Sequence, residues 1–373
     1  GLGHVSRTTA VGLALKRLYP ESRILLITGS AKTQMMVGRG SLDWIKLPSY
    51  QTILTGGKSE GRDGEAGFYK SVLGNLRTEM IADMVKVLRP RCLLVDHNPL
   101  GKRQELRQAL EQSADGDCCR LLGLRAIVGE DKAVWSAEPA RIFNEHFQDV
   151  LWYGDSGVLS DGPIQRITHH FNRSPVEMGY VSRVRELAHL YKEDADQEEP
   201  VGCTVSIPWF GSHTAELLSS LQEALSAMGD GWGRCDLYIE PSRTREVKEL
   251  FDPLSFCTVA PIGDRYIGSL ITSRVALIYG GYNSILDVLA LNRPALVVLR
   301  ATRDREQQEH LELLQRTVGT TMQVIEEEEV TGPVLEEKLR LLLDEKPGDS
   351  PPIDCDGAER TAAYLHRLVQ AQD

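Results

Sequence analysis

The sequence predicts an α/β protein in which parallel sheets are covered by helices and the chain forms two domains. Short apolar runs alternate along the chain with segments of helical periodicity. The runs are continuously apolar, as strands are when both faces of a parallel sheet are buried. At 373 residues the chain is long enough for two domains of ordinary size. The two halves therefore look like two Rossmann-type domains.

The order of the expected elements supports this division. The expected strands are 23–28, 92–96, 121–127, 149–153, 201–207, 235–239, 256–259, 275–279 and 295–299. Helices are expected over 1–18, 69–89, 213–228, 304–316, 333–344 and 357–370. The polar, acidic stretch Glu186–Glu199 interrupts the alternation. The predicted boundaries are an N-terminal domain over 1–182, a linker over 183–200, a C-terminal domain over 201–350 and a final helix within 351–373.

Composition limits the classes of function. A hydrophobic content of 42% is typical of a soluble globular protein, and the formal net charge of −11 argues against binding to nucleic acid. No apolar run approaches the ~20 residues of a membrane span, and no secretory signal is visible. The seven cysteines form no C-x-x-C pair, which favours buried free thiols in a reducing compartment. We therefore expect a cytoplasmic protein without a metal site, and the sequence does not indicate its oligomeric state.

The first residues look like a turn that should follow a strand. Gly1–His4 opens a helix directly, although an N-terminal sheet of this kind normally begins with a strand ahead of that turn. We expect that strand to be missing from this sequence because the record is trimmed.

The most informative motif is a strand, a glycine turn and a helix. The apolar run Val275–Tyr279 ends in Gly280 and Gly281, and a helical pattern follows until Pro294. Glycines let the backbone approach a ligand closely, and free N–H groups at a helix start attract phosphate. A tight connection without any ligand is the alternative interpretation.

Three polar residues follow these glycines. Asn283 and Ser284 are residue types that cap helices, and Asp287 lies one turn into the helix. A carboxylate at this place can accept hydrogen bonds from a ribose diol. Together with the glycine turn, the pattern suggests a nucleotide held by its diphosphate and its sugar.

A second constellation lies at the N-terminus. Glycines at positions 1 and 3 allow a ligand to approach, His4 projects into the same space, and Arg7 lies one turn further on. A histidine there can act as a general base because its ordinary pKa is near neutrality. The alternative is that His4 caps the helix and Arg7 pairs with a surface carboxylate. Asp96 and His97, at the carboxyl end of an expected strand, are reserve catalytic candidates.

The order of these motifs resembles a known family. G-x-G-H-x-x-R at Gly1–Arg7, G-G-Y-N-S-I-L-D at Gly280–Asp287 and R-E-Q-Q at Arg305–Gln308 resemble GT-B glycosyltransferases of the MurG-like group. Further segments are similar to a bacterial branch of predicted glycosyltransferases: Val95–Arg103, Leu124–Ile127, Met178–Val181 and Asp356–Arg360.

The resemblance implies a function and a set of site residues. Two Rossmann-like domains would face each other across a cleft, with the last helix returning to the N-terminal domain. The C-terminal domain would bind a nucleotide-sugar donor, which is expected to be a UDP-sugar, and the N-terminal domain a small-molecule or glycoconjugate acceptor. Transfer would need no metal or cofactor and would invert the anomeric centre. The implied catalytic residues are His4, Asp96 and His97; the donor-binding residues are Gly211, Ser212, Gly280, Gly281, Asn283, Ser284, Asp287, Glu306 and Gln307; and the acceptor-binding residues are Gly3, Arg7, Asn98 and Arg125.

One loop departs from the family's pattern. Where the family has a glycine-rich loop after the first strand of the C-terminal domain, Ser206–His213 keeps only Gly211 and Ser212 to approach a phosphate. Trp209 and Phe210 either stack on a base or sugar, or pack against the linker, and packing is the expectation.

Two other segments and three alternative functions stay open. Thr55–Phe68 is expected as a mobile glycine-rich loop, and Glu326–Glu329 as a solvated turn. The alternatives to a transferase are a nucleotide-sugar hydrolase of the same fold, a nucleotide-sugar 2-epimerase and a non-catalytic nucleotide-sugar-binding protein.

Overall fold

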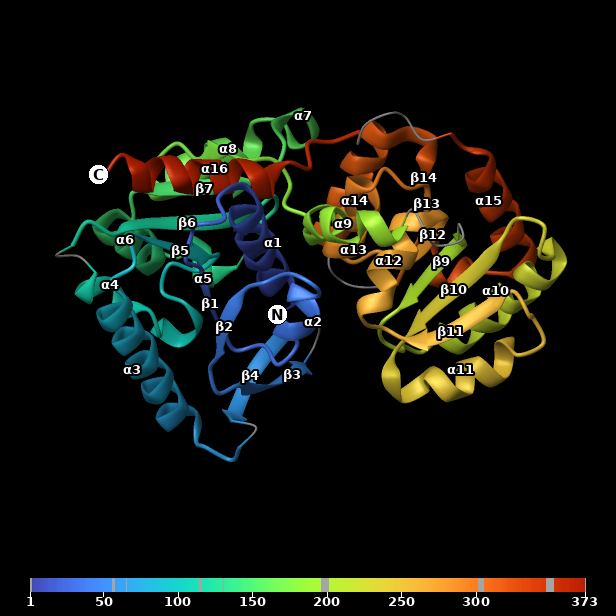
Figure 1. The fold of residues 1–373 in the computed structure, drawn as a ribbon, viewed down its shortest axis with the longest axis horizontal. Helices are drawn as coiled ribbons and strands as arrows, with labels where there is room; N and C mark the ends of the chain where they lie inside the picture. The colour runs from blue at the N-terminus through green and yellow to red at the C-terminus, as the bar shows by residue number, and fades with distance from the viewer. Residues whose placement is uncertain are drawn as a thin grey trace. The chain divides into compact units, whose positions relative to one another are not determined.

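The computed structural model describes residues 2–55, 58–64, 66–113, 116–129, 131–195, 201–300, 305–346 and 352–372. Within these ranges, the side chains of residues 2, 52–62, 192–195, 264 and 305–309 are not described. The chain divides into two compact units, which we call unit 1 (Gly1–Arg183 and Asp354–Asp373) and unit 2 (Val184–Ile353). Figure 1 shows their elements, and each unit is described by itself.

Unit 1 contains a four-stranded sheet, two smaller strand pairs and the last helix of the chain. Its elements are α1 (Leu2–Leu18), β1 (Leu25–Thr28), α2 (Thr33–Val37), β2 (Asp43–Lys46), β3 (Tyr50–Thr55), β4 (Lys58–Gly64), α3 (Lys70–Leu88), β5 (Cys92–Asp96), the 3-10 helix η1 (Lys102–Gln104), α4 (Arg107–Gln112), β6 (Cys119–Arg125), α5 (Lys132–Trp135), α6 (Ala137–His146), β7 (Asp149–Tyr153), α7 (Ser156–Leu159), α8 (Gly162–Phe171), β8 (Val176–Glu177) and α16 (Gly357–Gln370).

All strands of the main sheet in unit 1 are parallel. Their order is β5-β6-β7-β8, and β1 pairs with β2 in a separate parallel pair. Strands β3 and β4 form an antiparallel hairpin. The prediction of a mobile loop over Thr55–Phe68 is therefore wrong for Lys58–Gly64, where backbone pairing with β3 replaces a loop.

The first and last helices of unit 1 share a hydrophobic core. Ala10, Val11 and Ala14 of α1 pack with Leu121 and Leu151 of the sheet and with apolar residues of α16. Figure 1 shows α1 and α16 with this sheet, and the backbone carbonyl of Tyr180 accepts a hydrogen bond from Gly357 N (3.0 Å) at the start of α16. The C-terminal helix is therefore a structural part of unit 1, although it follows unit 2 in the sequence.

Unit 2 is a six-stranded parallel sheet with helices on both faces. Its elements are α9 (Arg183–Ala195), β9 (Val201–Ile207), α10 (Thr214–Met228), β10 (Arg234–Ile239), η2 (Pro241–Arg243), α11 (Thr244–Phe251), β11 (Cys257–Pro261), α12 (Asp264–Thr272), β12 (Ser273–Tyr279), α13 (Tyr282–Ala290), β13 (Ala295–Leu299), α14 (Arg305–Val318), η3 (Gly319–Thr321), β14 (Met322–Glu326), η4 (Glu327–Glu329) and α15 (Gly332–Asp344).

The strand order of unit 2 is that of a doubly wound nucleotide-binding sheet. The order is β11-β10-β9-β12-β13-β14, so the chain moves outward in one direction from β9 and in the other from β12. In open parallel sheets, ligands bind at the carboxyl ends of the strands where this direction reverses. The fold therefore marks the ends of β9 and β12 as the place to look for a ligand site.

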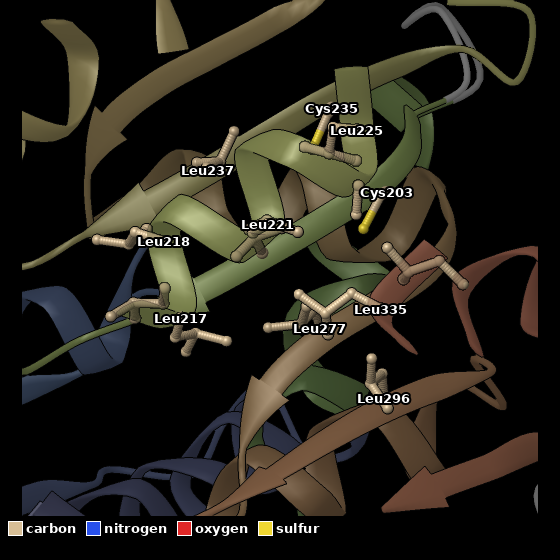
Figure 2. Close-up of a cluster of buried hydrophobic side chains, with 14 of the residues drawn as sticks. Cys203, Leu217, Leu218, Leu221, Leu225, Cys235, Leu237, Leu277, Leu296 and Leu335 are labelled. Carbon is tan, nitrogen blue, oxygen red and sulfur yellow. The ribbon is translucent and has the colours of Figure 1, made fainter. Parts of the chain in front are cut away.

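One face of this sheet is buried by a leucine stripe. Leu217, Leu221 and Leu225 recur every four residues along α10, and Figure 2 shows them against side chains of the strands and of α15. A spacing of four residues keeps side chains on one helix face, so α10 can cover the sheet along its length. On the opposite face, Thr204 of β9 hydrogen-bonds Ser269 of α12 (Oγ1···Oγ 2.7 Å).

The structure confirms the predicted α/β fold class and the strands on which it rested. Every expected strand is present, with ends that differ by at most two residues. The short strands β2 and β8, the hairpin and β14 were not predicted. The segment expected as a linker forms α9, which buries Val184, Leu187 and Tyr191 within unit 2.

Two further observations concern membrane-spanning helices and the cysteines. In the part of the chain described here, no helix is both long and apolar enough to cross a membrane. The seven cysteines form no disulfide; Cys118, Cys203, Cys235 and Cys355 are buried, as predicted, whereas Cys92, Cys119 and Cys257 are only partly buried.

Candidate functional site

In unit 1, three predicted residues from distant parts of the sequence meet at one carboxylate. Asp96 is the last residue of β5, and the first two turns of α1 bring His4 and Arg7 against it. Arg7 donates from Nε to Asp96 Oδ2 (2.8 Å) and from Nη2 to Oδ1 (2.7 Å). His4 Nδ1 lies 2.6 Å from Asp96 Oδ1. Because Arg7 pairs with a buried carboxylate, the alternative of a surface ion pair is wrong.

The charges of this trio fix the proton on His4. Burial alone would raise the pKa of Asp96, but the Arg7 charge and the hydrogen bonds from His4 and Arg7 hold it well below its usual range. An ionised Asp96 can only accept, so His4 Nδ1 carries the proton, and its 3.2 Å approach to Arg7 Nη2 is a contact between two donors. The other ring nitrogen, Nε2, is thereby left unprotonated.

His4 is suited to take up a proton near neutral pH. Its side chain is 43% exposed, whereas that of Asp96 is 2% exposed. Burial by the protein lowers the pKa of His4 below 6.5, while the hydrogen bond to Asp96 opposes this shift. The result is a neutral imidazole with its acceptor nitrogen fixed by a carboxylate, the arrangement of a histidine general base.

His97 forms a second imidazole–carboxylate pair beside the first. Its ring lies 5.0 Å from that of His4, and its Nε2 lies 3.7 Å from Asp131 Oδ2. His97 is 7% exposed, and its Nδ1 atom is buried without a hydrogen-bond partner among the described residues. The proximity of His97 lowers the pKa of Asp131, and the nearby charge of Arg125 adds to this effect. Asp131 was not singled out in the sequence, since no motif surrounds it.

The two other residues predicted to bind the acceptor have structural surroundings of their own. Both ends of the Asn98 amide are used within its turn, where Nδ2 donates to Gly101 O (2.9 Å) and Oδ1 accepts from Leu100 N (3.0 Å). Gly3 lies in the first turn of α1. Their roles toward an acceptor stay predictions.

In unit 2, the predicted glycine turn lies at the reversal point of the sheet. Gly280 and Gly281 connect β12 to α13, and the loop after β9 carries Gly211 and Ser212, both exposed. A side chain at Gly280 would collide with Leu299, and the backbone N–H of Gly280 donates a hydrogen bond to Val298 O (2.9 Å). This glycine is therefore needed for the tight connection between β12 and α13. Gly281 is the N-cap of α13 and provides no side chain for the first amides of the helix.

The predicted capping role of Asn283 and Ser284 is wrong. Both residues lie inside the first turn of α13, and its N-cap, Gly281, makes no side-chain hydrogen bond. An uncapped helix start favours an anion at this position. Asp287 lies further along the same helix, and only 8% of it is exposed.

The loop after β9 has its own amides satisfied by side chains. Gly211 N donates to Thr214 Oγ1 (2.9 Å), and Phe210 N donates to Glu240 Oε2 (3.1 Å). Phe210 also packs against the core of unit 2, but Trp209 is 45% exposed. The expectation that both aromatic residues pack away is therefore wrong for Trp209.

Behind Trp209 lies a buried polar cluster that the sequence did not reveal. Tyr279 donates to Glu327 Oε1 (2.5 Å), and the hydroxyls of Tyr279 and Thr214 lie 3.1 Å apart. Arg300 Nε lies 3.6 Å from Glu327 Oε2. Glu327 is 7% exposed, so the prediction of a solvated turn over Glu326–Glu329 is wrong at this residue. The missed signal was β14, which ends at Glu326 and carries Glu327 to the carboxyl edge of the sheet.

Two predicted donor-binding residues lie outside what can be placed. Glu306 and Gln307 fall in α14, among the residues whose side chains are not described. Among the described residues, no group of three or more His, Cys, Asp or Glu side chains is arranged to hold a metal ion.

The two Rossmann-like units, with their candidate residues at the carboxyl ends of parallel strands, define the GT-B fold class. Solved structures of this class match almost the whole chain. MurG of Acinetobacter baumannii is 12% identical, with a TM-score of 0.53 over 99% of this chain and 95% of that one. The UDP-GlcNAc 2-epimerase of Methanocaldococcus jannaschii is 9% identical, with a TM-score of 0.64 over 98% and 97%.

A third match was solved with a nucleotide sugar. The UDP-GlcNAc 2-epimerase of Neisseria meningitidis, bound to UDP-GlcNAc, is 10% identical, with a TM-score of 0.56 over 99% of this chain and 97% of that one. No protein-family model and no curated protein matches the sequence. At these identities the likeness establishes the fold, and the chemistry must be argued from the residues.

Proposed function

We propose that the chain is a glycosyltransferase that moves a hexosyl or N-acetylhexosaminyl group from a UDP-sugar to a hydroxyl or amine of an acceptor. The observation that carries this proposal is the His4–Asp96 pair, in which a clamped Nδ1 leaves Nε2 as a base. The resemblance of the motifs supports the reaction class, and the GT-B fold is compatible with it. Transfer is proposed to need no metal ion and to invert the anomeric carbon.

The proposed chemistry uses one proton acceptor and one anion site. As the acceptor oxygen or nitrogen forms its bond to the anomeric carbon, His4 Nε2 takes its proton. The bond from that carbon to the diphosphate breaks, and the nucleoside diphosphate leaves with the bonding electrons. Arg7 and Asp96 keep the imidazole in the required tautomer and orientation. A preorganised base of this kind typically contributes about 10²–10⁴-fold to a rate.

For the donor, the proposed site is the reversal point of the sheet in unit 2. The uncapped start of α13 would face the diphosphate, where aligned peptide dipoles stabilise the charge that develops on the leaving group. Asp287 would hold the ribose hydroxyls, as the resemblance implies. Because the amides of Phe210 and Gly211 are already bonded, the phosphate contacts are assigned to α13 and not to the loop after β9.

The test of the proposed function is a product analysis with a panel of UDP-sugars and candidate acceptors, with and without EDTA. A transferase consumes donor only when acceptor is present, and NMR of the product gives the anomeric configuration. UDP release from donor and water alone, unaffected by any acceptor, would replace the transferase with the hydrolase. The same His4–Asp96 pair can activate water, so this alternative rests on the same geometry.

Two other outcomes select the remaining alternatives. A change of configuration at C2 of the donor sugar, detected by NMR as a second nucleotide sugar, would identify a 2-epimerase. Nucleotide binding without any turnover would identify a non-catalytic binding protein.

The pH dependence of turnover follows from the pKa of His4. The base must be neutral, and burial lowers the pKa of His4 below 6.5. We therefore expect kcat/KM to fall as the pH decreases through this pKa and to be constant above it, with the midpoint of the acid limb below 6.5. A kcat/KM profile from pH 5 to pH 8 measures this midpoint. A midpoint above 6.5 would contradict the expected effect of burial on the pKa of His4.

Donor binding is expected to depend on Asp287. Asp287→Ala removes the proposed acceptor for the ribose hydroxyls, and hydrogen bonds to a charged group contribute about 1.5–3 kcal/mol. We expect UDP to bind about 10- to 150-fold more weakly by isothermal calorimetry, whereas Glu216→Ala, at an exposed carboxylate in the first turn of α10, should leave affinity unchanged. Equal affinity of wild type and Asp287→Ala would remove this residue from the donor site.

A further inference from the structure

Trp209 is an exposed aromatic ring held in a fixed position at the reversal point of the sheet in unit 2. It follows β9 by two residues, and 45% of it is exposed. Among the described residues, it is the only tryptophan with large exposure. An indole left partly open to water forgoes the burial of part of a large apolar surface. A function that needs the open ring would explain its position.

Tyr279 and Arg300 hold the ring of Trp209 in place. It is nearly parallel to the Tyr279 ring, with centroids 6.3 Å apart and an interplanar angle of 15°. The guanidinium carbon of Arg300 lies 5.6 Å from the centroid of Trp209 and 3.9 Å from that of Tyr279. Arg300 Nη2 also donates to the backbone carbonyl of Trp209 (2.8 Å). These contacts fix the position of the ring, while 45% of the residue stays exposed.

The supporting side chains are themselves held by the buried polar cluster. Glu327 accepts the hydroxyl of Tyr279 and balances the charge of Arg300. A buried glutamate paired with a partly buried arginine gives little net stability compared with apolar packing, and one reason to keep the pair is to fix a geometry. Here the geometry that they fix is the orientation of an open indole ring.

The ring lies beside the candidate anion site. A Cβ atom at Gly281 would lie 3.9 Å from Cη2 of Trp209, so the indole edge borders the N-cap of α13. A nucleotide sugar whose diphosphate meets this helix start has a ring on either side of the diphosphate, the nucleoside on one and the sugar on the other. Either ring offers a flat face that can stack on an indole.

We propose that Trp209 is a stacking platform for a ring of the bound donor and so determines donor affinity. This inference rests on the proposed function, because it assumes that a nucleotide sugar binds at the reversal point of the sheet. It assigns to the loop after β9, where the amides of Phe210 and Gly211 are already bonded, a contact with a ring of the donor.

The test compares Trp209→Ala, Trp209→Phe and wild type by calorimetry with UDP, UDP-N-acetylglucosamine and inorganic diphosphate. Trp209→Ala should lower the affinity for UDP-N-acetylglucosamine by about 5- to 150-fold, the range expected for one aromatic stack. Trp209→Phe should retain most of the wild-type affinity. An equal loss of affinity for UDP would show that the ring stacks on the base. An unchanged affinity for UDP would show that it stacks on the sugar. Tyr69→Ala, at an exposed tyrosine of unit 1, is the matched control and should change nothing.

A spectroscopic measurement adds a readout that a change in folding would not produce. Bound UDP-N-acetylglucosamine should protect wild type from acrylamide quenching of tryptophan fluorescence, and this protection should vanish in Trp209→Phe, which keeps the other four of the five tryptophans. Unchanged affinity in Trp209→Ala, or an equal loss with inorganic diphosphate, would overturn the stacking role while Asp287→Ala still reports on the donor site. If wild type binds no nucleotide, the proposed function and this inference both fall.

Discussion

His4→Ala is expected to lower kcat by about 10²–10⁴-fold, the usual contribution of a general base, while the affinity for UDP stays unchanged. The reason is that His4 lies in unit 1 and its proposed task is to take the acceptor proton, whereas the donor is proposed to bind to residues of unit 2. Because Nδ1 of His4 is hydrogen-bonded to Asp96 (2.6 Å), only Nε2 can accept the proton from the acceptor. Turnover assays and calorimetry on the same preparation separate the two effects.

The control for this experiment is another histidine of unit 1. His366 lies on α16 and stacks on Tyr19, with ring centroids 3.8 Å apart, so His366→Ala removes an aromatic contact away from Asp96. We expect it to keep its turnover. If His4→Ala retained full activity, the reserve candidate His97 would have to be tested, since its ring lies 5.0 Å from that of His4. Loss of UDP affinity in His4→Ala would contradict the division of tasks.

The sequence was sufficient to predict the fold and most of the candidate residues because both depend on local patterns. Continuous apolar runs show where buried strands lie, and a polar residue after such a run lies at the carboxyl edge of the sheet. This reasoning placed Asp96 beside a ligand site. It could not show that Arg7 and His4 would meet Asp96, because 89 and 92 residues separate them from it. That contact is made by the packing of α1 on the sheet.

The features of the candidate site that were not predicted depend on tertiary contacts. The residues involved are of types that usually lie on the surface or in loops. A run of four glutamates after residue 325 has the composition of a solvated turn, yet Glu327 is buried against Tyr279 and Arg300. Its burial is tolerated because two hydrogen-bonding groups and one positive charge surround it, and these come from β12, α10 and the residue that follows β13. Likewise, Trp209 was expected to pack, since an aromatic residue in a loop is usually covered by neighbours.

Removing Arg7 is expected to have the largest effect on stability. Arg7 is 3% exposed and makes both hydrogen bonds of a bidentate pair with Asp96, so Arg7→Ala leaves a buried carboxylate without its counter-charge. Breaking a buried pair in this way typically costs about 3–5 kcal/mol. Urea unfolding of the full chain, followed in the transition of unit 1, measures the loss. Arg243→Ala, at an exposed pair with Glu246, should cost less than about 1 kcal/mol.

The double variant and the pH dependence identify the cause of this loss. Arg7→Ala with Asp96→Ala removes both buried charges, so it should be more stable than Arg7→Ala alone. The pKa of Asp96 is depressed in the folded protein, so its pairing contributes stability above its ordinary value near 3.8, and this contribution declines as the pH falls below that value. In Arg7→Ala, burial instead favours the protonated carboxyl, and the difference from wild type should shrink on acidification. A difference that stays constant from pH 7 to pH 3 would mean that Arg7 stabilises unit 1 through packing and not through its charge.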